Sequence, residues 1–89
     1  MSNTFKNLQL LKQEQMSVKE QLGENYEATI KPFYDIIQMV MKANEENEFQ
    51  AMKRIKDSLE IYKKPDAPIL FTAALVEITE EKHFQGFEN

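Results

Sequence analysis

The stretch Ile69-Leu70-Phe71-Thr72-Ala73-Ala74-Leu75-Val76 is the one segment of this chain whose apolar residues surround a helix rather than line one side of it. A helix that is apolar on every side must be buried on every side. In a chain of 89 residues, either three other helices must pack around it or a partner must complete its enclosure. We therefore expect a small all-α protein in which the helix containing this stretch is central.

Glycine and proline mark the places where the helices should end. The chain has only two glycines and three prolines, which indicates long helices with short connections. Between these breaks the apolar residues recur with helical period. The sequence predicts a single helical domain over residues 1–89, folded as a small four-helix bundle with helices at about 4–22, 29–43, 48–63 and 67–84.

The start of the second helix depends on Pro32. If Thr29 is the N-cap, Pro32 lies in the first turn, where its missing N–H costs nothing. The alternative is a helix that begins near Asn25 and is kinked at Pro32, because a proline beyond the first turn loses a backbone hydrogen bond. The sequence leaves both possibilities open.

The boundary between the second and third helices is also open. Residues 44–47 contain neither glycine nor proline, so the two helices could continue as one. Against this, Asn47 and Gln50 have the spacing of a capping box, in which each side chain bonds to the backbone of the other residue.

The first predicted helix has a narrow apolar stripe with a polar residue at its middle. The stripe follows the alternating three- and four-residue steps of a coiled coil, but lasts barely two heptads. It either packs on helices of the same chain or forms a homodimer seam in which Gln15 sets the register. Because the central helix needs a further neighbour, we predict a partner-binding surface at Leu8, Leu11, Gln15, Val18, Leu22, Ile69 and Leu75.

The composition excludes several classes of function. The net charge of −4 argues against a protein that binds nucleic acid through its phosphate backbone. The absence of cysteine excludes disulfides, thiolate metal sites and thiol nucleophiles. The longest apolar stretch, residues 69–76, is far shorter than the roughly 20 residues of a membrane span. We expect a cytoplasmic protein with no contact with membranes.

Few residues could carry chemistry. Glu80 and His83 form a Glu-x-x-His pair, half of the motif that binds metal in ferritin-like bundles, but such a site needs a second pair and two further glutamates. A histidine in the last turn is better explained by its favourable interaction with the helix dipole and the free carbonyls there. Ser2, Ser17 and Ser58 have no neighbour that resembles a catalytic base. We predict no enzyme activity and no cofactor, with Glu80 and His83 as the one alternative for a metal.

A basic segment at residues 53–64 offers another alternative. Lys53, Arg54 and Lys56 could contact nucleic acid, as the recognition helix of a DNA-binding regulator does. Acidic residues such as Asp57 are interleaved with them at salt-bridge spacing, which favours a solvated surface.

These observations favour a protein-interaction module. We expect an adaptor, regulator or inhibitor that buries apolar helix faces against a second copy or another protein. Small cysteine-free proteins rich in lysine, asparagine and glutamate are often phage or mobile-element accessory factors or antitoxin-like neutralisers, an association rather than a physical inference.

Overall fold

The apolar C-terminal helix packs against every other α-helix in the computed structural model, which describes the backbone of residues 2–88 and the side chains of residues 9–81. Along the chain lie α1 (Ser2–Leu22), the 3-10 helix η1 (Gly23–Asn25), α2 (Tyr26–Asn44), α3 (Glu48–Ser58), the 3-10 helix η2 (Glu60–Lys63) and α4 (Ala67–Glu88). The structure is 90% helical and has no strand among the residues described. The prediction of an all-α fold is confirmed.

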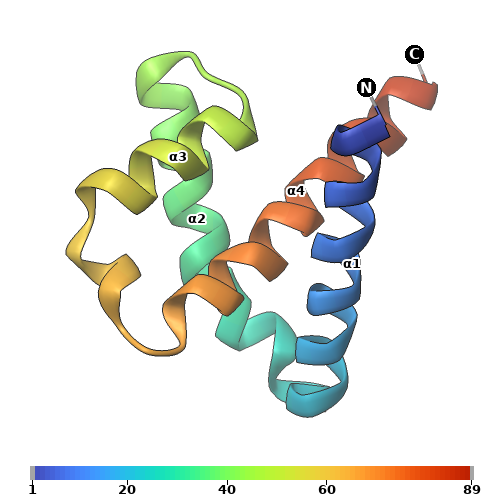
Figure 1. The fold of residues 1–89 in the computed structure, drawn as a ribbon, viewed down its shortest axis with the longest axis vertical. Coiled ribbons are helices and arrows are strands. Elements are labelled where there is room, and N and C mark those ends of the chain that lie inside the picture. The colour runs from blue at the N-terminus through green and yellow to red at the C-terminus, as the bar shows by residue number, and fades with distance from the viewer. Residues whose placement is uncertain (1, 89) are drawn as a thin grey trace.

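The helices are arranged around α4. In Figure 1, α1 and α2 diverge from their junction at η1, and α4 lies across the opening between them. α3 packs on both α2 and α4, and η2 also contacts α4. By contrast, α1 contacts α2 much less extensively than it contacts α4. The position of α1 therefore depends on α4.

The helix predicted over residues 48–63 is wrong in its C-terminal part. α3 ends at Ser58, and Leu59 adopts an extended backbone conformation with φ −98° and ψ 129° before η2 begins. α1, α2 and α4 have 21, 19 and 22 residues, whereas α3 has 11. The core is thus built from three long helices, with the short α3 and η2 covering one side. The predicted bundle of four full-length helices is not supported.

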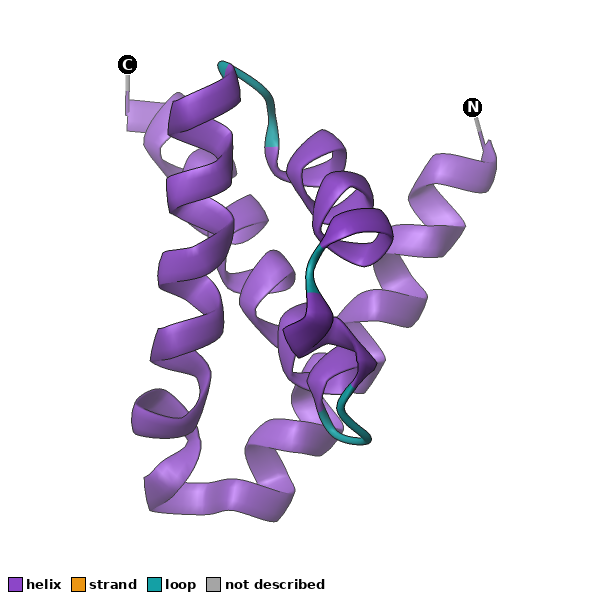
Figure 2. Ribbon diagram, turned by 90° about the vertical axis from the view of Figure 1, so that its left-hand side faces the viewer, coloured by secondary structure: helices purple, strands orange, loops and turns teal. Residues whose placement is uncertain are grey.

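The predicted start of the second helix at residue 29 is also wrong, and the alternative start near Asn25 is confirmed. Gly23 ends α1 as expected, with a left-handed φ of +55°, but η1 leads directly into α2 at Tyr26. In Figure 2 the chain from α1 to α2 is continuous helix, whereas loops separate the later elements. Pro32 therefore lies inside α2. Both Pro32 and Ala28 are exposed, so water can solvate the Ala28 carbonyl that lacks its helical partner.

α2 and α3 are separate helices. Glu45 follows α2 with a left-handed conformation of φ 54° and ψ 47°. The capping box predicted at the start of α3 is confirmed: the Gln50 backbone N–H donates to Asn47 Oδ1 at 2.8 Å, and the Asn47 N–H donates to Gln50 Oε1 at 3.1 Å.

The core is centred on Phe71, whose side chain is fully buried. The Phe33 ring of α2 meets it edge to face, with centroids 4.9 Å apart, and the Tyr62 ring of η2 lies 5.7 Å away. Ala73 and Ala74 are also fully buried. α4 is therefore largely enclosed by its own chain.

None of the helices in the described part of the chain is both long and apolar enough to span a membrane.

Candidate binding groove

The apolar stripe of α1 packs inside the chain. Gln15 and Val18 are both 4% exposed, and Leu11 and Leu22 are half-buried against the core. Leu8 lies outside the residues whose side chains are described. The structure thus places four of the five stripe residues between helices of one chain.

The two partner-binding residues predicted on α4 have different environments. Leu75 is buried, whereas Ile69 is 45% exposed. Of the predicted partner-binding residues whose side chains are described, Ile69 is therefore the most accessible to a second protein.

The polar residue at the middle of the α1 stripe has partners on two other helices. Gln15 Nε2 donates to Tyr26 Oη at 3.0 Å and to Glu77 Oε2 at 2.9 Å. Tyr26 Oη in turn donates to Glu77 Oε2 at 2.6 Å. We call Gln15, Tyr26 and Glu77 the polar triad; it joins α1, α2 and α4. The sequence contained one signal for it, because a glutamine within an apolar stripe requires a hydrogen-bonding partner when it is buried.

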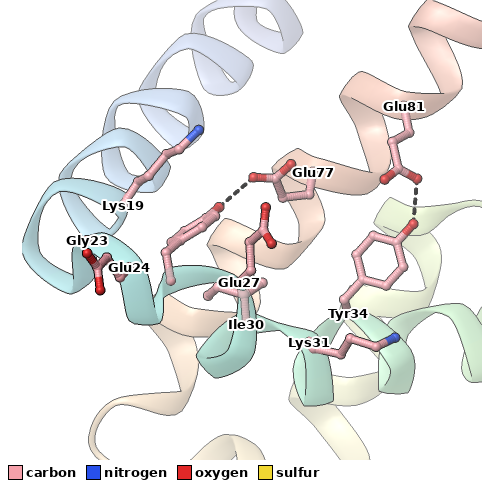
Figure 3. Close-up of a pocket in the computed structure, with 10 residues that line it drawn as sticks. Lys19, Gly23, Glu24, Glu27, Ile30, Lys31, Tyr34, Glu77 and Glu81 are labelled. Carbon is pink, nitrogen blue, oxygen red and sulfur yellow. Dashed lines mark hydrogen bonds between the residues drawn. The ribbon is translucent and has the colours of Figure 1, made fainter.

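A second tyrosine–glutamate pair joins α2 to α4. The Tyr34 hydroxyl donates to Glu81 Oε2, one helical turn beyond Glu77 along α4. Figure 3 shows the two pairs side by side, with the carboxylates of Glu77 and Glu81 each facing a hydroxyl of α2. Neither pair was predicted, because their members are 51 and 47 residues apart in sequence.

Both tyrosines are held in the protonated form. Burial and the hydrogen bond to Glu77 raise the pKa of Tyr26 far above its ordinary value. The hydrogen bond to Glu81, followed by burial, raises the pKa of Tyr34. Each hydroxyl therefore remains a donor at neutral and mildly alkaline pH, and each keeps its carboxylate in place.

These pairs border an open groove of about 600 Å³, bounded by α1, η1, α2 and α4. Besides the two tyrosines, the groove is lined by Ile30, Gly23 and six charged residues: Glu24, Glu27, Glu77, Glu81, Lys19 and Lys31. Lys31 is paired with Asp35, with Nζ 3.2 Å from Oδ1. Lys19 Nζ lies 5.8 Å from the centroid of the Tyr26 ring. Carboxylates thus outnumber cations in the groove, and the buried Tyr26 ring already has one cation near it.

The three residues proposed for nucleic-acid binding lie exposed on α3. Arg54 Nε donates to Glu46 Oε1 at 3.0 Å, so a carboxylate already lies against the guanidinium. Lys53 and Arg54 share a shallow depression with Asp57 and Glu46. The structure therefore brings these cations together with acidic groups rather than into a continuous basic surface.

Of the proposed metal-binding pair, Glu80 and His83, the structure describes only the side chain of Glu80. Glu80 Oε2 is bonded to Lys12 Nζ of α1 at 2.7 Å. Within the described part of the chain, no group of three histidine, cysteine, aspartate or glutamate side chains lies close enough to hold a metal ion.

Comparison of the chain with protein-family models, with curated proteins and with solved structures gives no match. The function is therefore argued from the groove itself.

Proposed function

We propose that the protein is a small interaction module that binds a lysine- or arginine-rich segment of a partner protein in the groove between α1, α2 and α4. The observation that carries this proposal is the pairing of Glu77 and Glu81 with tyrosine hydroxyls along an open groove with an excess of carboxylates. In this function, α4 at the centre of the small bundle holds one wall of the groove through Glu77 and Glu81.

The charged part of the groove suits a basic side chain. A carboxylate accepts several hydrogen bonds, and bonds from ammonium or guanidinium groups to it are stronger than neutral ones. Because Glu77 and Glu81 are already held by Tyr26 and Tyr34, less side-chain freedom is lost when a ligand binds. Preorganised acceptors of this kind favour a cationic partner.

The apolar part of the groove suits the rest of such a side chain. Lysine and arginine carry apolar stems, which cover apolar surface while their charged ends remain near polar groups. The half-buried ring of Tyr34 lines the groove and supplies such a surface, and the Tyr26 ring already has an ammonium group, that of Lys19, close to it. The excess of carboxylates would also repel phosphate, which supports a protein partner over nucleic acid.

The proposal is tested by the binding of fluorescent lysine- and arginine-rich peptides, measured by anisotropy at several salt concentrations. Glu24 and Glu27 are exposed in the groove and take no part in the two tyrosine–glutamate pairs. We expect the double variant Glu24→Gln/Glu27→Gln to weaken binding about fivefold, because each exposed ion pair contributes roughly 0.5 kcal/mol. Binding of the wild type should weaken as salt increases.

The matched control replaces two exposed glutamates that do not line the groove, in the variant Glu14→Gln/Glu60→Gln. It changes the net charge equally and should bind as the wild type does. Equal weakening by both double variants, or equal binding of a neutral glutamine-rich peptide, would refute a specific basic-segment site.

A further inference from the structure

α1 is attached to the rest of the molecule in an unusual way. Its contacts are mainly with α4, and its covalent link to α2 is the three-residue η1. Within the covalent link, the direction in which α1 leaves α2 is set by η1, whereas the packing that holds α1 in place comes mainly from α4. Short hinge segments of this kind favour the exchange of an element between identical chains.

The conformation of Gly23 determines that direction. Its φ of +55° is one that residues with a Cβ rarely adopt, whereas the residues that flank η1, Leu22 and Tyr26, have right-handed conformations. A Cβ at Gly23 would meet no atom within 4 Å. A larger residue there would consequently change the backbone preference of the hinge without a steric clash.

If Gly23 adopted the right-handed helical conformation, α1, η1 and α2 would form one uninterrupted helix over residues 2–44. α1 would then point away from the α4 of its own chain. The faces of α1 and α4 that now pack together would both be exposed, including Val18 and the members of the polar triad. Such a chain needs a second copy to cover these faces.

We propose that two copies of this chain exchange α1, so that each α1 packs on the α4 of the other copy. The second copy fits because every contact between α1 and α4 can form again with the same residues. Gln15 of one chain would bond to Glu77 of the other, and Lys12 would pair with Glu80. The closed monomer and the exchanged dimer then differ chiefly in the hinge conformation and in the entropy of association.

The first test measures solution mass by light scattering across a concentration series for the wild type, Gly23→Ala and Gly23→Asn. Alanine favours a continuous helix and disfavours the left-handed conformation, whereas asparagine tolerates it. We expect Gly23→Ala to dimerise at a concentration about tenfold lower than the wild type, or lower still. Gly23→Asn is the matched control and should resemble the wild type.

The second test identifies the interface. The chain has no cysteine, so Lys12→Cys and Glu80→Cys can be introduced in separate chains, mixed, refolded and treated with a short bismaleimide. The native side chains at these positions are exposed and bonded at 2.7 Å within one closed chain. Exchange of α1 predicts a covalent dimer between the two different chains, and none when Lys12→Cys chains are present by themselves.

The same mixture is examined with and without Gly23→Ala, so the test does not depend on the folding of that variant. If Gly23→Ala stays a folded monomer at all concentrations, the proposal is wrong. A dimer that gives no cross-link between the Lys12→Cys and Glu80→Cys chains would show a different interface and would also refute it. Neither outcome bears on peptide binding, which is measured with the groove variants.

Discussion

At the scale of single residues, Glu77 is the group that joins α1, α2 and α4 through polar contacts. Its Oε2 atom accepts from both Gln15 and Tyr26, and these three residues belong to three different helices. The sequence showed that Gln15 interrupts an apolar stripe, which indicated a special role. Its partners could not be predicted, because a glutamine in a stripe satisfies its amide equally well across a dimer seam or inside one chain.

The raised pKa of Tyr26 predicts how stability depends on pH. A tyrosine whose pKa is higher in the folded than in the unfolded chain stabilises the fold fully below the unfolded value of 10.0, and this contribution is lost as pH rises above it. Urea unfolding should therefore show a stability that falls above pH 10. Tyr26→Phe should lose roughly 1.5–3 kcal/mol at pH 7, because it removes a hydrogen bond to a carboxylate.

The same variant should flatten the alkaline decline, because a phenylalanine side chain has no proton to lose. Tyr34→Phe is the matched control, since Tyr34 is only half-buried and its bond to Glu81 is exposed. Tyr34→Phe should reduce the free energy of unfolding at pH 7 by less than Tyr26→Phe does. Parallel declines for the wild type and Tyr26→Phe would contradict this account.

At the scale of elements, a helix boundary could be predicted where a local capping signal marks it and not where the sequence carries no such signal. The capping box at Asn47 involves only four consecutive residues, so it could be recognised from sequence. The end of α3 before Leu59 could not be recognised from sequence, because no glycine or proline is present there. It allows Tyr62 to pack against Phe71, a contact between residues of different elements.

The capping box makes a prediction about α3. Asn47→Ala removes the acceptor for the Gln50 N–H and should destabilise the protein by about 1 kcal/mol, within a range of roughly 0.5–2 kcal/mol. Asn25→Ala is the matched control, because Asn25 precedes α2 but makes no side-chain capping bond. It should change stability by less than about 0.5 kcal/mol in the same chemical-unfolding experiment. Equal losses of stability in Asn47→Ala and Asn25→Ala would mean that the capping box does not stabilise α3.

At the scale of the whole molecule, the enclosure of α4 explains why one apolar stretch predicted so much of the fold. The apolar stripe of α1 is too narrow by itself to cover one side of α4. Because Gln15 is hydrogen-bonded within the polar triad, it can be buried against α4 and so widens the contact. η2, which the sequence predicted as the end of the third helix, supplies a further neighbour as a separate 3-10 helix. The groove could not be predicted, because its walls come from α1, η1, α2 and α4.

The centre of this enclosure should dominate stability. Phe71→Ala should cost about 3–5 kcal/mol, since Phe71 is fully buried between Phe33 and Tyr62. That loss is comparable to the roughly 5–15 kcal/mol that stabilises a typical small domain, so a large fall in melting temperature is expected by circular dichroism. Ile69→Ala, on the exposed side of the same helix, should change the melting temperature little. Similar effects of the two substitutions would argue against α4 as the centre of the core.

The dependence of α1 on α4 also has a consequence for the order of events during synthesis. α1, α2 and α3 leave the ribosome before α4 does; α3 can already pack on α2, but the apolar stripe of α1 has little cover until α4 has been made. Chain elongation at roughly 5–20 residues per second is slow compared with helix formation. The nascent chain therefore passes through an interval in which α1 exists without the helix that buries it, and the contacts of α1 with α4 form only after the ribosome has released residues 67–88.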